Sequence, residues 1–505
     1  MSADAYDLIV IGSGPAGEKG AAQAAYFGKR VALVEADARL GGAAANTGTL
    51  PSKTLRETAL YLTGFRQRGL YGVTFTLREK VTARDFLRRE RTVVEAENER
   101  VANNLARHGI ALHSGRAEFV DAHTLLVRRP DGTTRQLRGD VMLVATGSRP
   151  FRDARLPFDD PRVFDSDTIL SLVDIPAAMV VAGGGVIGCE YACLFSALGV
   201  KVTLVDGHDR LLGFLDGEVS DALQASMASL GVDLCLNDAI LSVETKGPMV
   251  VSLRSGRRIE AGALLAATGR SGNTAGLGLD ALGIRTTSRG LIEVNAHYQT
   301  TVPHIYAAGD VIGFPALAST SMEQARVAMV HAFDFKYKTA VASTIPYGIY
   351  TIPECSMVGA TEEALAASGT PYVVGRARYD QNARGQIIGD ASGFLKLLFR
   401  LPDMTLVGVH VFGEQASELI HIGVTAMHAE AGADLFIRMC LNYPTLSELY
   451  KYATYDAMGR RDRMGEGARG ARGARGAGGA EGAEGAGGAG GAKGAKGAGG
   501  AEGAG

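Results

Sequence analysis

Two segments of the chain carry three glycines at the spacing that brings a polypeptide backbone close to a phosphate group. They read Gly12-Ser-Gly14-Pro-Ala-Gly17 and Gly183-Gly-Gly185-Val-Ile-Gly188. In this pattern the first glycine makes a tight turn, the second lets a pyrophosphate approach, and the third lets the following helix pack against the strand. The free amides at the N-terminus of that helix attract the phosphates. Each segment therefore predicts a dinucleotide site, and the alternative is a tight strand-to-helix turn without a ligand.

An acidic residue closes the next apolar strand after each glycine motif. Glu35 and Asp206 each lie 18 residues beyond the last glycine of their motif. A carboxylate at this place accepts hydrogen bonds from a ribose diol. Asp206 favours NAD over NADP, because it accepts from a 2'-hydroxyl and repels a 2'-phosphate. His208 and Arg210 are able to meet such a phosphate, so the preference between the two nucleotides stays open.

Three more short motifs end apolar strands. Ala145-Thr-Gly147 follows the first glycine motif, Ala267-Thr-Gly269 follows the second, and Tyr306-Ala-Ala-Gly309-Asp310 comes later. Asp310 supplies a carboxylate that can bond a polyol. These positions strengthen the prediction of two nucleotide sites.

The elements that must position these motifs are short apolar runs that alternate with helical stretches up to about residue 460. This alternation is typical of parallel sheets built from βαβ units. The runs expected as buried strands are 8–11, 31–34 and 141–145 in a first set, and 179–182, 202–205 and 264–267 in a second. From about residue 344 the polarity alternates within the runs, as in 394–400 and 406–412, which favours an antiparallel sheet. The sequence therefore predicts an α/β fold with two Rossmann-like dinucleotide-binding domains and a C-terminal α+β domain.

Length, charge and cysteine content exclude several classes of protein. The 505 residues are enough for about three domains of roughly 150 residues. The 52 basic and 54 acidic residues leave a net charge of -2, which gives no electrostatic footprint for nucleic acid or an anionic membrane. No apolar run approaches the roughly 18 residues of a membrane span. Five cysteines argue against a disulfide framework and favour a reducing, cytoplasmic compartment.

The end of the chain has a different composition. From Gly467 to Gly505 it repeats Gly-Ala-X, with X drawn from arginine, lysine, glutamate and glycine. The period is that of collagen, but collagen depends on proline, which this repeat lacks. A repeat without apolar side chains larger than alanine cannot offset its ordering entropy. We therefore expect residues 461–505 to be a disordered, solvated extension.

In the kind, order and spacing of these motifs, residues 6–458 resemble the pyridine nucleotide-disulfide oxidoreductase family, which includes dihydrolipoyl dehydrogenase, glutathione reductase and mercuric reductase. The resemblance implies an FAD-binding domain over 1–150 and 276–343, an NAD(P)-binding domain over 151–275 and a dimerisation domain over 344–460. It also implies FAD as the cofactor, NAD(H) and NADP(H) as substrates, and a homodimer.

The resemblance assigns site residues as well. Those implied to hold FAD are Gly12, Gly14, Gly17, Glu35, Gly42, Lys53, Ala117, Thr146, Gly147, Asp310 and Ala318. Those implied to hold NAD(P) are Gly183, Gly185, Gly188, Asp206 and Gly269. The family also pairs a lysine near the reactive flavin nitrogen with a glutamate, and Lys53 and Glu190 match those positions. The alternative for this pair is a surface lysine and a helix glutamate without a role.

Two departures from the family pattern bear on the chemistry. Ala44 and Thr49 replace the redox cysteines of the family's Gly-Gly-x-Cys-x-x-x-Gly-Cys-x-Pro-Ser-Lys segment. Disulfide exchange needs a thiolate, which neither side chain can supply. Where the family carries a His-Pro-Thr base near its C-terminus, this chain has Tyr443, with Glu448 as the matching acid. A phenol, with an ordinary pKa of about 10, is a poor base for thiols at neutral pH.

Threonine in place of the second cysteine, in Gly48-Thr-Leu-Pro-Ser-Lys53, resembles the soluble, Si-specific pyridine nucleotide transhydrogenase branch of the family. The resemblance implies hydride transfer between NAD(H) and NADP(H) through flavin N5 without a disulfide relay. Two alternatives stay open. One is an NAD(P)H diaphorase or quinone reductase of the same fold, and the other is a non-catalytic scaffold that carries flavin.

Overall fold

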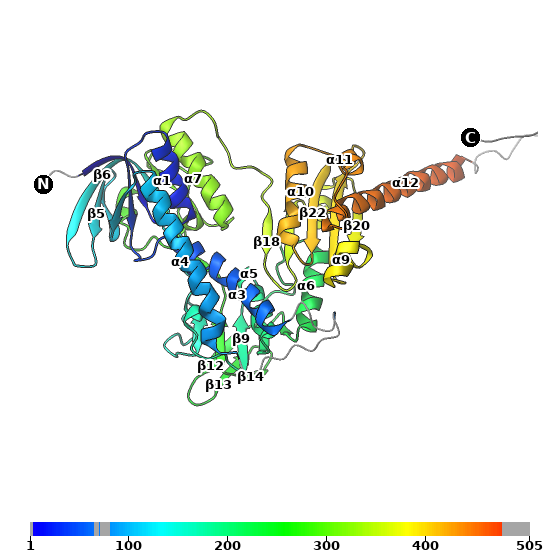
Figure 1. Ribbon diagram of the computed structural model, residues 1–505, viewed down its shortest axis with the longest axis horizontal. Coiled ribbons are helices and arrows are strands. Elements are labelled where there is room, and N and C mark those ends of the chain that lie inside the picture. Colours follow the sequence, from blue (N-terminus) through cyan, green and yellow to red (C-terminus); the bar gives the residue numbers. More distant parts are fainter. Residues whose placement is uncertain (1–3, 65–69, 71–80, 477–505) are drawn as a thin grey trace, which may run out of the picture. The chain divides into compact units, whose positions relative to one another are not determined.

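The computed structural model of the chain describes residues 4–64, 70 and 81–476, with only the backbone from residue 465 on. Residues 1–457 form one compact unit and residues 458–505 a second. The first unit contains three large sheets and the helices that cover them (Figure 1). Within the described ranges, no helix is long and apolar enough to cross a lipid bilayer.

The first sheet carries the first glycine motif at the carboxyl end of β1 (Asp4–Ile11). Its order is β3-β2-β1-β6-β5-β4, and β17 pairs with the last residues of β6. Neighbouring strands from β3 to β6, and β17, are parallel, whereas β4 and β5 run antiparallel. The bounds are β2 (Val31–Glu35), β3 (Ala111–Ser114), β4 (Arg116–Asp121), β5 (Thr124–Arg128), β6 (Thr134–Val144) and β17 (Ile305–Ala307). The three predicted strands of the first set are confirmed, although β6 ends one residue early.

Alternate residues of β1 face different layers. Leu8 and Val10 pack with residues of α1 (Pro15–Tyr26), α4 (Ala83–Arg107) and α7 (Ala318–Phe333). Ile9 and Ile11 pack on the other side, with residues of β4 and β5. Figure 1 shows α1 and α7 side by side on one face of this sheet. The period of two in the strand therefore places helices on one side and residues of β4 and β5 on the other.

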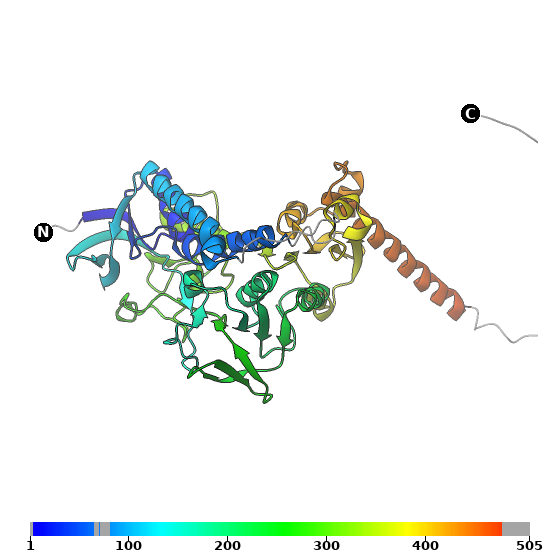
Figure 2. The ribbon, with the colours of Figure 1, turned by 60° about the horizontal axis from the view of Figure 1, so that its bottom comes forward.

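The second sheet is parallel throughout, in the order β11-β10-β9-β15-β8. Its strands are β8 (Val163–Asp165), β9 (Ala178–Ala182), β10 (Lys201–Val205), β11 (Asp233–Cys235) and β15 (Ala263–Ala266). The second set of predicted strands is thus confirmed to within one residue. Helices α5 (Val186–Ala197) and α6 (Gly217–Ser229) cover one face. The other face packs against the antiparallel strands β12 (Ile240–Glu244), β13 (Met249–Leu253) and β14 (Arg258–Ala261), drawn in green in Figure 2.

The third sheet is antiparallel, as the alternating polarity predicts, and its order is β18-β19-β22-β21-β20. Its strands are β18 (Tyr347–Ile349), β19 (Cys355–Gly359), β20 (Tyr372–Arg378), β21 (Phe394–Arg400) and β22 (Leu406–Phe412). The accompanying helices are α8 (Glu362–Ser368), α9 (Ala383–Ile388), α10 (Ala416–His428) and α11 (Ala433–Arg438).

Short elements connect the sheets. Helices α2 (Gly42–Asn46) and α3 (Thr49–Thr63) follow β2, and α3 packs against α5. The antiparallel pair β7 (Ser148–Pro150) and β16 (Arg270–Gly272) joins the ends of the first and second parallel sheets. Single 3₁₀ turns occur at Thr168–Ser171, Asp280–Leu282, Asp310–Ile312, Tyr379–Gln381 and Leu446–Glu448.

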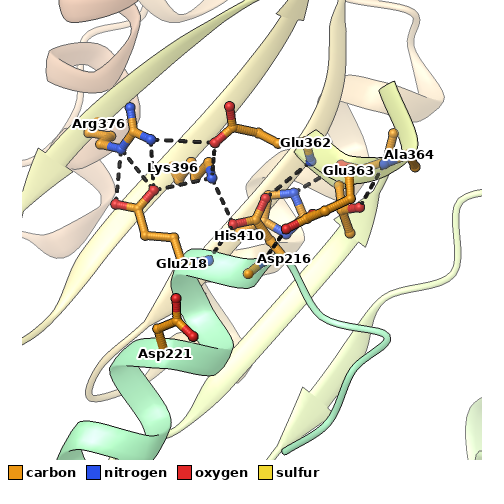
Figure 3. Close-up of polar contacts among 12 residues, drawn as sticks. Asp216, Glu218, Asp221, Glu362, Glu363, Ala364, Arg376, Lys396 and His410 are labelled. Atoms are coloured by element: carbon orange, nitrogen blue, oxygen red, sulfur yellow. Dashed lines mark hydrogen bonds and ion pairs between the residues drawn. The ribbon is translucent and has the colours of Figure 1, made fainter. Parts of the chain in front are cut away.

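A buried cluster of charges joins the antiparallel sheet to α6. The side chain of Lys396 in β21 is 1% exposed and forms ion pairs with Asp216 at 2.7 Å, Glu218 at 3.1 Å and Glu362. Arg376 in β20 also pairs with Glu218, at 2.8 Å. Figure 3 shows these carboxylates pointing at the lysine ammonium from the start of α6 and from α8. The lysine therefore supplies the cation that three converging carboxylates need.

The last described helix, α12, spans Leu449–Gly476. This differs from the expectation that disorder begins at residue 461. Tyr450 and Ala453 at the start of α12 are buried. A helix that is already nucleated extends at low cost, and the alanines and arginines that follow are good helix formers, whereas the glycines between them are poor ones. Residues 477–505, the rest of the predicted extension, lie outside the described residues.

Candidate functional site

One cavity of about 1400 Å³ collects most of the residues that the sequence singled out. The loops after β1 and β9, with the two glycine motifs, both open into it. Its wall includes Gly12, Gly14, Glu35, Gly42, Lys53, Ala117, Thr146, Gly147, Asp310, Ala318, Gly183, Gly185, Glu190, Asp206 and Gly269. Four of the predicted site residues do not line the cavity, namely Gly17, Gly188, Tyr443 and Glu448.

The turn after each strand requires glycine. Gly12 has a φ of 102° and Gly183 a φ of 107°. Residues that carry a Cβ rarely adopt φ values in this range. A Cβ at Gly12 would lie 2.4 Å from the Ala145 carbonyl oxygen, and one at Gly183 would lie 2.5 Å from that of Ala267. The Ala-Thr-Gly motifs noted in the sequence are therefore the backbone against which each glycine turn packs.

The third glycine of each motif lies under the helix, which explains its absence from the cavity wall. A Cβ at Gly17 would be 1.8 Å from the Gly12 oxygen, and one at Gly188 would be 1.8 Å from the Gly183 oxygen. The middle glycines differ. Gly14 has only the Cα of Gly42 near its missing side chain, at 3.9 Å, and Gly185 has no described atom within 4 Å. The backbone thus leaves room for a phosphate at both places, so the cavity fits two dinucleotides.

The carboxylate of Glu35 is bonded into the first glycine loop. Its Oε2 accepts from the Ser13 amide at 2.8 Å and from the Ser13 hydroxyl at 2.6 Å, and its Oε1 accepts from the Asp37 amide at 2.8 Å. The Ser13 hydroxyl in turn accepts from the Gly41 amide at 3.0 Å. The loop, the acid and the start of α2 are therefore one hydrogen-bonded unit.

Asp206 takes the corresponding place at the second motif. Its Oδ2 accepts from the Gly184 amide, and its Oδ1 accepts from the His208 amide at 2.8 Å and faces His208 Nδ1 at 2.7 Å. Burial raises the pKa of Asp206, but the hydrogen bonds from Gly184 and His208 outweigh it and hold that pKa below its usual range. The carboxylate is therefore charged at neutral pH.

A chain of polar contacts that sequence reasoning missed links the two Ala-Thr-Gly motifs. Arg270 Nε donates to the Ser148 hydroxyl at 2.7 Å, and that hydroxyl donates to Asp310 Oδ2 at 2.9 Å. Ser148 and Arg270 directly follow Gly147 and Gly269, so their equivalent positions were the available signal. The hydroxyl of Thr146 is buried and finds no hydrogen-bond partner among the described residues. Its oxygen is free to bond a polar ligand in the cavity.

Lys53 and Glu190 meet across the interface of α3 and α5. The lysine Nζ lies 2.9 Å from Glu190 Oε1 and 2.7 Å from Oε2, with the side chains 26% and 7% exposed. Glu190 Oε1 also accepts from the Tyr350 amide at 2.9 Å. The lysine Nζ lies 5.0 Å from the centre of the Tyr350 ring, an aromatic wall residue that the sequence did not reveal. An ammonium paired in this way presents positive charge to the cavity.

Asp167 is an acidic residue of the cavity wall that was not predicted from the sequence. Burial raises the pKa of Asp167, although Arg270 opposes this with a guanidinium nitrogen 3.7 Å from its carboxylate. Asp167 follows β8, a strand that the sequence reading did not include, so no motif marked it.

The positions of the missing redox cysteines, Ala44 and Thr49, lie on the cavity wall. All five cysteines fall within the described residues, and none lines the cavity. Cys193 and Cys355 are fully buried, and burial raises the pKa of each thiol to about 12. A thiol with such a pKa is not a nucleophile at neutral pH. The cavity therefore has no thiol of its own.

Tyr443 and Glu448 lie outside the wall of this cavity. Tyr443 is 75% exposed, and Glu448 is partly buried in a 3₁₀ turn. An exposed tyrosine is compatible with the expected role at a partner subunit, which stays a prediction.

Comparison with known proteins decides the family. The family model described as pyridine nucleotide-disulphide oxidoreductase matches residues 6–332, and the model of its dimerisation domain matches residues 345–454. The chain belongs to this family. The expected α/β architecture is thereby confirmed together with the family resemblance.

Relatives and solved structures agree. The chain is 46% identical over 468 residues to a soluble pyridine nucleotide transhydrogenase of Mycobacterium tuberculosis, covering 92% of this chain and 99% of that protein. It is 42% identical over 460 residues to one of Yersinia enterocolitica, covering 90% and 98%. The structure of LpdA from Mycobacterium tuberculosis matches with a TM-score of 0.82 and 29% identity over 89% of this chain and 99% of that one. The flavoprotein disulfide reductase RclA from Escherichia coli matches with a TM-score of 0.80 and 27% identity, covering 88% and 98%.

Proposed function

We propose that the protein is an FAD-dependent soluble pyridine nucleotide transhydrogenase that passes reducing equivalents between NAD(H) and NADP(H). The main support is a single cavity whose wall contains both glycine motifs and the Lys53–Glu190 ion pair. Ala44 and Thr49 occupy the positions on this wall where the family has its two redox cysteines. Identity of 46% and 42% to two soluble pyridine nucleotide transhydrogenases supports the proposal. Exchange of electrons between two nucleotides through a flavin needs no thiol in the cavity.

In this proposal the first glycine motif holds FAD, with Glu35, Asp310 and Thr146 as polar partners. FAD, when bound, supplies a ring that exchanges two electrons with a nicotinamide. The Lys53 ammonium stabilises negative charge that develops on a ring bound beside it, because it acts in a partly desolvated cavity. Glu190 keeps the ammonium in place and is itself fixed by the Tyr350 amide.

The second glycine motif binds the substrate nucleotides one after the other. Gly183, Gly185 and Gly188 shape the turn, Gly269 lies beside it, and Asp206 accepts from the ribose. Since both nucleotides share the phosphate and nicotinamide groups, one site serves both half-reactions. The second nucleotide enters after the first product leaves.

The proposal includes a homodimer through the antiparallel sheet, in which Tyr443 and Glu448 approach the cofactor of the partner subunit. The match of residues 345–454 to a dimerisation domain supports it. It also includes a reducing, cytoplasmic location, for which the five free cysteines are the support.

A steady-state assay tests the activity. The holoenzyme should oxidise NADPH in proportion to reduction of a thionicotinamide analogue of NAD⁺, which absorbs at a distinct wavelength. Oxidation of NADPH or NADH that requires an added quinone, with no transfer to the analogue, would identify the quinone reductase instead. A flavin that neither nucleotide reduces would identify the scaffold.

A further inference from the structure

The residue beside Asp206 has a hydrogen-bonding pattern that depends on its charge. His208 Nδ1 lies 2.7 Å from Asp206 Oδ1, and the histidine side chain is 85% exposed. A carboxylate only accepts hydrogen bonds, so Nδ1 carries the proton that it donates to Asp206. The other ring nitrogen, Nε2, is therefore the atom that gains or loses a proton. Because the side chain is exposed and lines the cavity, Nε2 is accessible to a bound nucleotide.

The charged groups near His208 have partners of their own. Arg210, on the same loop, pairs with Asp221 at 3.1 Å. The neighbouring segment bonds to the loop through the Asn237 amide, which donates to the His208 carbonyl at 2.9 Å. On that segment, Asp238 Oδ1 accepts from the Ala239 and Ser255 amides, while Arg254 donates to the Asn237 carbonyl. Asp209 is the adjacent charge on the loop itself.

The two forms of the imidazole suit the two nucleotides differently. With Nε2 unprotonated, the ring is an acceptor and the Asp206–His208 pair carries a net negative charge, which matches a 2'-hydroxyl donor. With Nε2 protonated, the pair is neutral overall and presents an N–H donor, which matches a phosphate oxygen. Histidine is the side chain that ordinarily changes between these forms at about pH 5 to 8.

We propose that His208 selects between the two nucleotides by its protonation, so that NADP(H) binds together with a proton at Nε2 whereas NAD(H) does not. This inference rests on the proposed function and adds its regulation. It also explains how a site with an acid at Asp206 accepts a 2'-phosphate. By linkage, a ligand that binds together with a proton loses affinity as the pH rises, so the affinity for NADP(H) should fall with rising pH whereas the affinity for NAD(H) changes little.

Isothermal titration calorimetry of the oxidised holoenzyme with NADP⁺ and with NAD⁺, from about pH 6 to about pH 8, tests this inference without turnover. Each titration is made in two buffers of different ionisation enthalpy, which reports the protons taken up on binding. NADP⁺ should bind with net proton uptake and a steep pH dependence, and NAD⁺ with neither.

The 2'-phosphate of NADP⁺ also changes its protonation in this pH range. Two variants distinguish its contribution to the pH dependence of binding from that of the His208 imidazole. His208→Gln should lower NADP⁺ affinity about tenfold at the acid end of the range and flatten its pH profile, because a charge-assisted hydrogen bond is lost. His208→Lys should keep NADP⁺ affinity up to the alkaline end. His428→Gln, an exposed histidine of α10, is the matched control and should change nothing.

Binding of both nucleotides with the same pH profile in the wild type and in His208→Gln overturns this inference alone. Failure of both nucleotides to bind the wild type overturns the proposed function and the inference with it. Unchanged thermal unfolding of His208→Gln will show that the variant is folded.

Discussion

The loop after β1 and the loop after β9 have almost the same backbone. Their first glycines have φ values of 102° and 107°, and their third glycines would each place a Cβ 1.8 Å from the carbonyl oxygen of the first. In both loops an acid at the end of the next strand accepts from the amide of the second motif residue, Ser13 or Gly184. Side chains, rather than backbone, therefore distinguish the two sites.

The side chains around the two acids are different. Glu35 is bonded to the buried hydroxyl of Ser13, which also accepts from Gly41 and so connects the loop to α2. Asp206 faces a histidine that is 85% exposed, and its loop has a glycine where the first has the serine. The first loop is closed by internal hydrogen bonds, whereas the second presents an ionisable group to solvent. The glycines thus define where a dinucleotide fits, and under the proposed function the neighbouring polar side chains would suit the first loop to a resident cofactor and the second to exchanging substrates.

The largest effect is expected from adding a methyl group at the third glycine of either loop. Gly17→Ala forces the Cβ into the Gly12 oxygen and should produce protein without flavin that unfolds at a much lower temperature. Gly188→Ala should keep the flavin but abolish its reduction by NADPH and NADH. Flavin absorbance and thermal unfolding measure both outcomes.

Gly213→Ala is the control, because a Cβ there meets no described atom within 4 Å and the φ is ordinary. Loss of flavin from Gly188→Ala with retention in Gly17→Ala would reverse the assignment of the two loops.

The next largest effect concerns the ion cluster that joins the antiparallel sheet to α6, the helix on one face of the second sheet. Lys396→Met removes the cation from Asp216, whose side chain is 1% exposed, and should lower the free energy of unfolding by about 3–5 kcal/mol, because that buried carboxylate loses its partner. Urea unfolding measures this loss. Lys246→Met, at an exposed lysine, should be neutral. A loss of less than about 1 kcal/mol would show that solvent screens the cluster as it does a surface pair.

The same cluster has an acid dependence. Burial raises the pKa of Asp216, but nearby His410 and the bonded Lys396 outweigh it and hold that pKa below its usual range. A depressed pKa in the folded state stabilises the protein above the unfolded pKa of about 4, and this stability is lost as the pH falls through the folded value. The difference in stability between wild type and Lys396→Met should therefore shrink below about pH 4.

Much of the fold was predictable from the sequence because the parallel strands are apolar throughout. Runs such as 179–182 and 202–205 are buried on both faces, and their identity as strands needs no knowledge of their neighbours. The antiparallel sheet was predictable from alternation in 394–400 and 406–412. The end of α12 was not, because its continuation to Gly476 depends on nucleation by a buried first turn rather than on the repeat itself.

The site was predictable where a motif must have one residue type, as at Gly12 and Gly183. It was not predictable where the partners are far apart in the sequence. The contacts of Arg270 with Ser148, and of Tyr350 with Glu190, join segments more than 100 residues apart. No local pattern encodes such a pairing, since either partner alone is an ordinary polar or aromatic residue.

A change at Lys53 should have an effect on rate rather than on folding. Lys53→Gln removes the ammonium and should slow reduction of the flavin about 100-fold, as loss of one electrostatic stabiliser does. Anaerobic stopped-flow absorbance measures this rate. Lys336→Gln, at a lysine whose side chain is 79% exposed, serves as the control. An unchanged rate would mean that Lys53 and Glu190 are a structural pair only.

The smallest expected effect tests the serine that distinguishes the two loops. Ser13→Gly gives the first loop the glycine of the second and should cost about 1 kcal/mol of stability, since the hydroxyl bonds to Glu35 and Gly41 are lost. Flavin should also dissociate more readily on dilution. If retention of flavin is unchanged, the closed character of the first loop does not depend on this hydroxyl.

Double-mixing stopped flow under anaerobic conditions tests whether two nucleotides exchange electrons through one flavin without a thiol. NADPH is mixed with the holoenzyme first, and NAD⁺ is added once the visible flavin absorbance has bleached. We expect complete bleaching, no long-wavelength thiolate–flavin band, and full recovery of the absorbance with NAD⁺. Bleached flavin that NAD⁺ cannot reoxidise, or a thiolate–flavin band in the reduced enzyme, would contradict this expectation.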